Sequence, residues 1–326
     1  SGGQLQHVDR DAFGRVPNLG RPSEPERLSV VRPLERREPD GGIRLARPRQ
    51  WVKNGFVAAP LFFTPEAVTR ANLALIAVAV IAFCLLSSAI YVFNDWCDRE
   101  ADRAHPAKRT RPIASGAVSP TAGLVFAVLL AAAGFALAAV IPGRAFLAFA
   151  AAYTALSVLY SARLKHVAVL DVIVVSSGFV LRVLAGAAAV AITPTTWIVV
   201  CTFLLALFIA FGKRRDDLVK DMSDSHRPSL AGYNLRFVDT ALGVTLAALV
   251  VSYLIYTTTE SVIVKFGTDK LYLTAPFVIA GVLRYLQIAL VEERSGSPTD
   301  LAVGDRFLIL TVLGWIVTFS LLIYGK

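Results

Sequence analysis

The chain has 326 residues, of which 55% are hydrophobic and 17% are charged, and its mean hydropathy is +0.59. This composition excludes an ordinary soluble domain and indicates a polytopic membrane protein. The net charge of +9 fits basic loops at one membrane face and anionic lipid or phosphate ligands better than it fits nucleic acid. The three cysteines are too few and too scattered for a disulfide framework or a zinc site.

Residues 1–45 are rich in Arg, Pro, Gly and Glu, and they predict a disordered polar tail on the cytoplasmic side. Residues 46–326 predict one all-α domain of nine transmembrane helices, because most of the apolar runs reach the ~20 residues that span a bilayer. The nine segments are 48–64, 72–95, 118–141, 144–162, 167–192, 195–212, 236–258, 271–291 and 304–324. The first segment is short and contains Lys53 and Asn54. This favours a helix that begins buried in the protein or at the membrane interface.

Basic residues concentrate in alternate loops, which places these loops in the cytoplasm together with the amino terminus. Nine spans then put the carboxyl terminus outside. Every polar motif falls at the cytoplasmic face, as expected for an active site built at one side of a membrane.

The second apolar segment ends in an acidic junction. In a continuous helix, Asn94, Asp98 and Asp102 lie at i, i+4 and i+8 on one face, with Asp95 beside them. Carboxylates repel the negative end of a helix dipole as well as each other, so the cluster predicts a hard cation. Mg²⁺ is the expected ion, because it binds one or two carboxylates together with water and phosphate oxygens. The alternative is a solvated polar cap.

A second acidic cluster follows the sixth segment, where Asp217 and Asp221 are at i and i+4. Alone, it is typical of a solvated loop. Paired with the first cluster, it predicts that two acidic faces share Mg²⁺ around a diphosphate, whose departure the metal assists.

Basic and polar groups adjoin both clusters and are candidates for phosphate binding, although positive-inside topology explains part of this charge. They are Lys53, Asn54, Lys108, Arg109, Arg111, Lys213 and Arg214. Within the fifth segment, Asp171 and Arg182 are eleven residues apart and so share a helix face. Ionisable groups inside a membrane usually face a cavity or a partner. Tyr160, Lys165 and Asp171 are therefore predicted to line a cavity.

The junction Asn94-Asp95-x-x-Asp98-x-x-x-Asp102 resembles the first aspartate-rich motif of the UbiA superfamily of intramembrane prenyltransferases. The nine segments and the second acidic loop agree with that family. The resemblance implies that Mg²⁺ binds a diphosphate between Asn94, Asp98 and Asp102 on one side and Asp217 and Asp221 on the other. It also implies a lipid substrate that enters laterally from the bilayer.

Further motifs are similar to those of the actinobacterial decaprenyl-phosphate phosphoribosyltransferases within this superfamily. They are residues 47–54, 108–116, 164–166, 212–214 and 298–306. The resemblance implies transfer of 5-phosphoribosyl from 5-phosphoribosyl 1-diphosphate to decaprenyl (polyprenyl) phosphate at the plasma membrane, for cell-wall arabinan synthesis. In the implied reaction, the lipid phosphate would be the nucleophile, and nearby carboxylates would stabilise the positive charge that develops at the anomeric carbon. The loop of the second motif varies within this group. The sequence leaves homo-oligomerisation open.

Two other functions remain to be weighed. A prenyltransferase with a prenyl diphosphate donor and an aromatic acceptor needs the same acidic motifs, and it differs in requiring an aromatic-lined cavity. A transporter would use Asp171 and Arg182 to mark a permeation path, but no inverted repeat is visible and the acids gather at one face.

Overall fold

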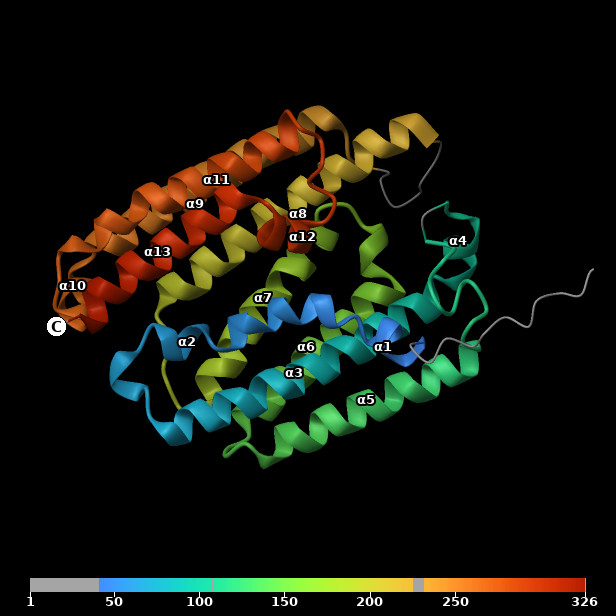
Figure 1. The fold of residues 1–326 in the computed structure, drawn as a ribbon, viewed down its shortest axis with the longest axis horizontal. Helices are drawn as coiled ribbons and strands as arrows, with labels where there is room; N and C mark the ends of the chain where they lie inside the picture. Colours follow the sequence, from blue (N-terminus) through green and yellow to red (C-terminus); the bar gives the residue numbers. More distant parts are fainter. Residues whose placement is uncertain (1–40, 107, 225–231, 326) are drawn as a thin grey trace, which may run out of the picture. The chain divides into compact units, whose positions relative to one another are not determined.

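The computed structural model describes residues 41–106, 108–224 and 232–325, and within them it does not describe the side chains of residues 41, 43 and 221–224. Within these residues, eight helices are long and apolar enough to cross a membrane (Figure 1). They are α3 (Arg70–Cys97), α5 (Pro120–Val140), α6 (Ala145–Ala162), α7 (Leu170–Ala189), α8 (Thr196–Asp224, which spans over Thr196–Lys220), α9 (Leu235–Thr258), η5 continued by α11 (Ala275–Leu290; together Lys270–Leu290) and α13 (Arg306–Tyr324). The all-α, multi-pass prediction is confirmed, and the described part contains no strand. The predicted tail at residues 1–40 lies outside the described residues.

The first apolar segment corrects the prediction of nine membrane helices. It forms two short helices, η1 (Pro48–Val57) and α2 (Ala59–Phe62), and a third, η2 (Pro65–Ala67), follows directly after it. Each begins at a proline in its first two positions. Proline has no N–H to donate and clashes with the preceding turn, so each one starts a new helix instead of continuing the last. The segment runs beside α3 in Figure 1 and packs against α3 and α7.

Residues 41–45, which the sequence places in the tail, belong to a further short helix, α1 (Gly41–Ala46). Leu45 is buried in a cluster with Val92 and Ile113, so the folded domain begins before residue 46. The remaining short elements are α4 (Arg99–Ala104), η3 (Leu164–His166), α10 (Glu260–Phe266), η5 (Lys270–Thr274) and α12 (Pro298–Gly304).

Neighbouring long helices pack in sequential pairs: α3 with α5, α6 with α7, and α8 with α9. One core lies around Phe83, where its ring meets those of Phe146 and Tyr153 with centroids 5.9 and 5.2 Å apart. Outward-facing apolar side chains such as Val128 and Leu310 are more than 60% exposed. In a helical bundle of this composition, these surfaces face lipid tails.

Side-chain caps position several helix starts. Thr69, Ser119, Asn234 and Asp305 each accept a hydrogen bond from a backbone N–H three residues ahead, at the amino ends of α3, α5, α9 and α13. Such caps satisfy N–H groups that have no partner within the helix.

The polar motifs meet at one end of the bundle. Lys165, before α7, forms an ion pair with Asp98 at the carboxyl end of α3. Arg214 of α8 pairs with Asp171 of α7, and Thr299 of α12 donates to Gln50 of η1 at 3.3 Å. The sequence prediction that these motifs share one face of the domain is confirmed for these residues.

Candidate active site

The acidic junction is a helix with one kink. α3 ends at Cys97 and α4 begins at Arg99, with Asp98 between them at φ −89° and ψ 0°. The i, i−4 hydrogen bonds nevertheless continue, from Asp98 N to Asn94 O at 2.9 Å and from Asp102 N to Asp98 O at 2.8 Å. The predicted stacking of Asn94, Asp98 and Asp102 along the chain is therefore present in the backbone.

Asp95 and Asp102 are buried and bind two arginines. Arg47 Nη2 donates to both carboxylate oxygens of Asp95, at 2.6 and 2.8 Å. Arg111 Nη1 bridges the two acids, at 3.0 Å from Asp95 Oδ1 and 2.6 Å from Asp102 Oδ2. Charge-assisted contacts of this kind fix a guanidinium in one orientation. The two carboxylates thus hold Arg47 and Arg111 at the edge of the site.

Asp98 is more accessible than its two neighbours, with 28% of its side chain exposed. Its Oδ1 pairs with Lys165, and its Oδ2 accepts a hydrogen bond from Asn94 Nδ2 at 3.1 Å. The Oδ1 of Asn94 has no donor among the described residues. Asp98 and Asn94 therefore present oxygen atoms together at the open side of the junction.

The second motif is tied to α7 through Arg214. Arg214 Nε donates to Asp171 Oδ2 at 2.6 Å, and its Nη1 donates to Asp217 Oδ2 at 3.0 Å. Its Nη2 reaches Tyr160 Oη at 3.3 Å. Tyr233 donates to the other oxygen of Asp171 at 2.5 Å, and burial together with this bond raises the pKa of the Tyr233 hydroxyl, which keeps it protonated. The structure thus brings the predicted cavity groups Tyr160 and Asp171 to the second motif.

Lys213 connects the two motifs electrostatically. Its side chain is exposed, and its charge interacts with those of Asp217 and Lys53, and with that of Arg111, the partner of Asp102. It forms no hydrogen bond or ion pair within the described residues. The side chain of Asp221 lies outside the described part, so its predicted metal role stays a prediction.

The remaining predicted phosphate groups occupy the turn after α4. Arg109 is exposed and makes no side-chain hydrogen bond within the described residues, whereas Lys108 is half-buried and has interaction partners. Both lie near the Arg111 end of the junction in sequence, and the structure leaves their predicted roles as predictions.

A buried polar network lies deeper along α7. Arg182 is 5% exposed and donates to Asn54 Oδ1 at 2.9 Å, Gly178 O at 3.0 Å and Tyr153 Oη at 2.8 Å. Neighbouring Lys53 lies outside the eight membrane-spanning helices. Burial, with the positive charges of Arg182 and Arg47, lowers the pKa of Lys53 to about 8.

Comparisons with known proteins agree with this architecture. The model of the UbiA prenyltransferase family matches residues 56–310. The chain belongs to the UbiA prenyltransferase family. It is therefore a membrane-embedded transferase, as the sequence motifs predict.

Two curated relatives cover nearly the whole domain. The chain is 35% identical to the decaprenyl-phosphate phosphoribosyltransferase of Mycolicibacterium smegmatis, over 87% of this chain and 92% of the relative. It is 34% identical to the enzyme of the same name from Corynebacterium glutamicum, over 93% of both chains. A solved UbiA homologue from Archaeoglobus fulgidus, bound to GPP and Mg²⁺, superposes with a TM-score of 0.64 at 21% identity, covering 87% of this chain and 99% of that one.

The donor atoms of this UbiA site suit a hard cation. Asn94, Asp98 and Asp217 offer carboxylate and amide oxygens, and Mg²⁺ prefers such ligands. Within the described ranges, no three carboxylate, imidazole or thiol groups lie close enough to hold one ion by themselves. Because Mg²⁺ usually completes its shell with water and substrate phosphate, one or two carboxylates meet its requirement.

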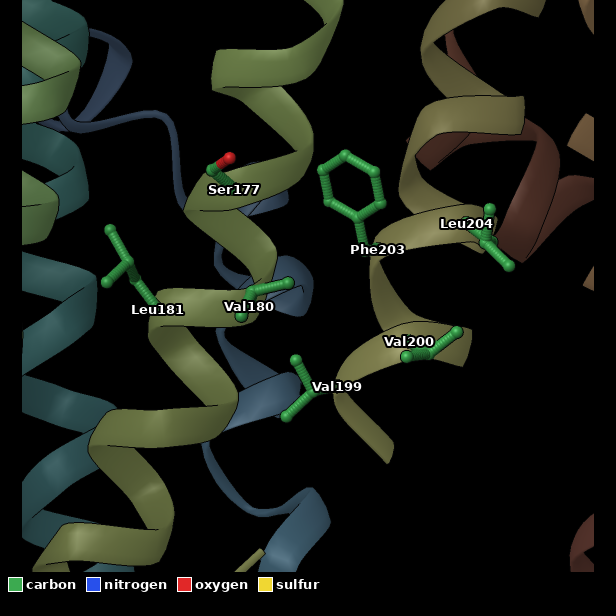
Figure 2. Close-up of a pocket in the computed structure, with 7 residues that line it drawn as sticks. All are labelled: Ser177, Val180, Leu181, Val199, Val200, Phe203 and Leu204. Atoms are coloured by element: carbon green, nitrogen blue, oxygen red, sulfur yellow. The ribbon is translucent and has the colours of Figure 1, made fainter. Parts of the chain in front are cut away.

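An apolar groove of about 440 Å³ lies between α7 and α8, farther from the polar end than Asp171 and Arg214 (Figure 2). Figure 2 shows Phe203 and Val199 of α8 directed toward Val180 of α7. Ser177 is the one polar residue among those that line it. The residues that line the groove therefore offer no charged group to a diphosphate.

Sequence reasoning missed Arg47 and Tyr233 as site residues. Arg47 has φ 50° and ψ 60°, a left-handed conformation that is costly for a residue with a Cβ. It directly precedes Pro48, and its two bonds to Asp95 retain it there. Tyr233 lies next to Asn234, the N-cap of α9, and no local pattern links it to Asp171, 62 residues away.

Proposed function

We propose that this enzyme transfers a 5-phosphoribosyl group from 5-phosphoribosyl 1-diphosphate to decaprenyl or another polyprenyl phosphate, releasing diphosphate. The observation that carries the proposal is 34–35% identity, over more than nine-tenths of their length, to two relatives named for decaprenyl-phosphate phosphoribosyl transfer. A charged site with both carboxylates and several cations is consistent with substrates that carry three kinds of phosphate.

The acidic groups are proposed to bind the leaving diphosphate through Mg²⁺. Asp98 and Asn94 would hold the metal from the first motif, and Asp217 from the second, with Asp102 and Asp221 completing the predicted set. A Mg²⁺ ion held there would neutralise negative charge on the departing diphosphate. In the structure, Lys165 pairs with Asp98 and Arg214 pairs with Asp217. Once Mg²⁺ and substrate are bound, these two cations could contact phosphate oxygens instead.

The cations at the rim are proposed to bind the other donor oxygens. Arg111 is oriented by Asp95 and Asp102, and it presents a guanidinium whose fork geometry suits phosphate. Lys108, Arg109 and Lys213 supply further positive charge for the 5-phosphate or the diphosphate.

The reaction needs no general base from the chain. An anionic oxygen of the lipid phosphate forms a bond to the anomeric carbon of ribose, while the bond from that carbon to the diphosphate oxygen breaks and its electron pair leaves with the diphosphate. The residues described here position the two phosphate groups and stabilise charge, so their contribution is orientation and electrostatics.

The distribution of Lys and Arg supports a multi-pass protein of the plasma membrane with its active site on the cytoplasmic side. That side would receive the water-soluble donor directly, while the lipid acceptor and bilayer lipid reach the domain from the membrane. The product would serve as a precursor for cell-wall arabinan.

The proposal is tested with the purified full chain in detergent. The protein is incubated with Mg²⁺, 5-phosphoribosyl 1-diphosphate labelled in the ribose, and a polyprenyl phosphate, and the mixture is extracted with organic solvent. We expect label in the lipid phase, lost when the metal is chelated. Absence of label, with diphosphate released only from a prenyl diphosphate and an aromatic acceptor, would instead assign the enzyme to prenyl transfer.

A further inference from the structure

Most cations at the polar end of the domain are matched by a carboxylate. Arg47 pairs with Asp95, Arg111 with Asp102, Lys165 with Asp98, and Arg214 with Asp171. Within the described residues, Lys53 and Arg182 form no ion pair. Because a charge withdrawn from water is costly without a counter-ion, these two positions need a separate explanation.

Arg182 is held by neutral groups alone. Three of its five N–H donors are used by Asn54, Gly178 and Tyr153, which leaves two available. Its guanidinium also lies 4.5 Å from the ring centroid of Tyr153 and 5.2 Å from that of Phe179. These contacts orient the cation without neutralising it.

Lys53 lies next to this guanidinium and makes no hydrogen bond within the described residues. The charged groups that interact with it electrostatically are Arg182, Arg47 and Lys213, and all three are cationic side chains. Burial and these cations lower its pKa to about 8, as expected for a partly buried lysine whose charged neighbours are positive.

The position of Arg182 along α7 separates it from the acidic motifs, and Lys53 lies between them, within range of Arg182, Arg47 and Lys213. Arg182 donates to Gly178, seven residues along α7 from Asp171, a rise of roughly 10 Å. If the diphosphate leaves toward Asp98 and Asp217, direct displacement requires the attacking oxygen to approach the anomeric carbon from the opposite side. Arg182, with Lys53 beside it, lies in that direction, farther along α7 from the polar end.

We propose that Lys53 and Arg182 bind the phosphate of the lipid acceptor, as a site separate from the donor diphosphate site at the acidic motifs. The inference rests on the proposed function for the identity of the lipid, and it names the residues that bind the nucleophile. Asn54 and Tyr153 act on the lipid through Arg182, as positioning residues.

The test measures binding without turnover. The full chain is placed in nanodiscs of zwitterionic phospholipid, with no donor present, and titrated with a fluorescent polyprenyl phosphate and with the matching uncharged polyprenol. We expect wild type to prefer the phosphate by tenfold or more. Lys53→Gln and Arg182→Gln should lose this preference and bind the polyprenol as wild type does.

Two further variants keep the test decisive. Arg284→Gln removes an arginine that pairs with Glu292 and Asp305 away from this site, and it should retain the full preference. Arg182→Lys, which keeps the charge and loses the fork, should give an intermediate preference. If Arg182→Gln does not fold, Arg182→Lys and Lys53→Gln together test whether this site binds the lipid phosphate.

The outcomes separate this site from the overall function. An unchanged preference in Lys53→Gln and Arg182→Gln or Arg182→Lys, or no preference in wild type, would overturn the assignment. Suppose that wild type prefers polyprenyl phosphate, that this preference depends on Arg182, and that no phosphoribosyl is transferred from 5-phosphoribosyl 1-diphosphate. That result would support the lipid site and reject the proposed donor. Transfer with binding insensitive to both residues would reject the site and keep the function.

Discussion

Arg214 and Asp171 lock α8 to α7 at the polar end of the domain, through a 2.6 Å bond from Nε to Oδ2. The other oxygen of Asp171 accepts a hydrogen bond from the Tyr233 hydroxyl at 2.5 Å, so one buried carboxylate joins α7, α8 and the segment that precedes α9. Arg214 in turn contacts Asp217 of the second acidic motif. The position of that motif therefore depends on a residue outside it.

Asp171→Asn should weaken both the fold and the reaction. The substitution keeps the shape and removes the charge, which leaves Arg214 with Asp217 as its remaining carboxylate partner. Losing one member of a buried ion pair typically costs about 3–5 kcal/mol, and we expect the low end because Asp217 remains. Thermal unfolding in detergent measures the loss, and the transfer assay should show at least about a tenfold fall in kcat.

Asp269→Asn is the matched control for this change. Asp269 lies between α10 and η5, is exposed, and makes no side-chain hydrogen bond within the described residues. Its replacement should leave both the unfolding temperature and turnover as in wild type. Equal behaviour of the two variants would contradict the role assigned to the Arg214–Asp171 pair.

Asp98→Ala should remove activity while the protein stays folded. Asp98 is the more accessible acid of the first motif, and its loss takes away the carboxylate proposed to hold Mg²⁺. We expect turnover to fall by about 10²–10³-fold, the usual effect of removing one group that stabilises developing charge. Glu100→Ala is the control. It removes an equal charge two residues away from Asp98, at a side chain that is 68% exposed, and it should remain active. Full turnover in Asp98→Ala would remove it from the metal set.

The pKa of Lys53 predicts how donor-independent lipid binding changes with pH. A lysine with a pKa of about 8 loses its charge between pH 7 and pH 9, so affinity for polyprenyl phosphate should fall over that interval. Lys53→Arg keeps its charge throughout, and its affinity should stay constant across the interval. The charged groups that act on Lys53 are Arg182, Arg47 and Lys213. A pH profile unchanged by Lys53→Arg would show that another group titrates.

The same shift has a defined sign for stability. Lys53 has a folded-state pKa below its ordinary value of 10.5, so between pH 8 and pH 10.5 the unfolded chain binds more protons than the folded one. Stability from this group therefore rises with pH across that window. Unfolding of wild type compared with Lys53→Gln isolates the contribution.

The long helices were predictable because apolar runs of about 20 residues have few alternatives in a membrane. The break in the first segment was readable in principle from Pro48, Pro60 and Pro65, yet apolar composition alone obscured it. The spacing of Asn94, Asp98 and Asp102 correctly predicted a helical stack through the junction, because local hydrogen bonds determine it.

The local sequence pattern did not predict which side chains pair with one another. Asp171 and Arg182 share a helix face, as their spacing predicts, but each has partners from other elements. Arg182 bonds with Asn54, 128 positions away, and Asp95 bonds with Arg47, 48 positions away. Such pairings follow from the packing of distant segments, and the local sequence around each residue carries no signal for them.

Gly186 sets the position of Lys53 and Asn54 through a close backbone approach. A Cβ at Gly186 of α7 would lie 1.8 Å from the carbonyl oxygen of Val57 at the end of η1. This obstacle is backbone and cannot rotate away, so Gly186→Ala should push η1 from α7 and disturb the Asn54–Arg182 bond. Overpacking of this kind typically costs about 1–3 kcal/mol, and more where backbone must move. We expect a lower unfolding temperature and a weaker preference for polyprenyl phosphate over polyprenol.

Gly243→Ala separates this packing effect from the helix propensity of alanine. Gly243 lies within α9, and a Cβ there meets no atom within 4 Å. Because alanine in a helix is favoured over glycine by roughly 0.5–1 kcal/mol, this variant should unfold at the wild-type temperature or slightly above it. If Gly186→Ala behaved in the same way, the contact between α7 and η1 could not be what holds Lys53 beside Arg182.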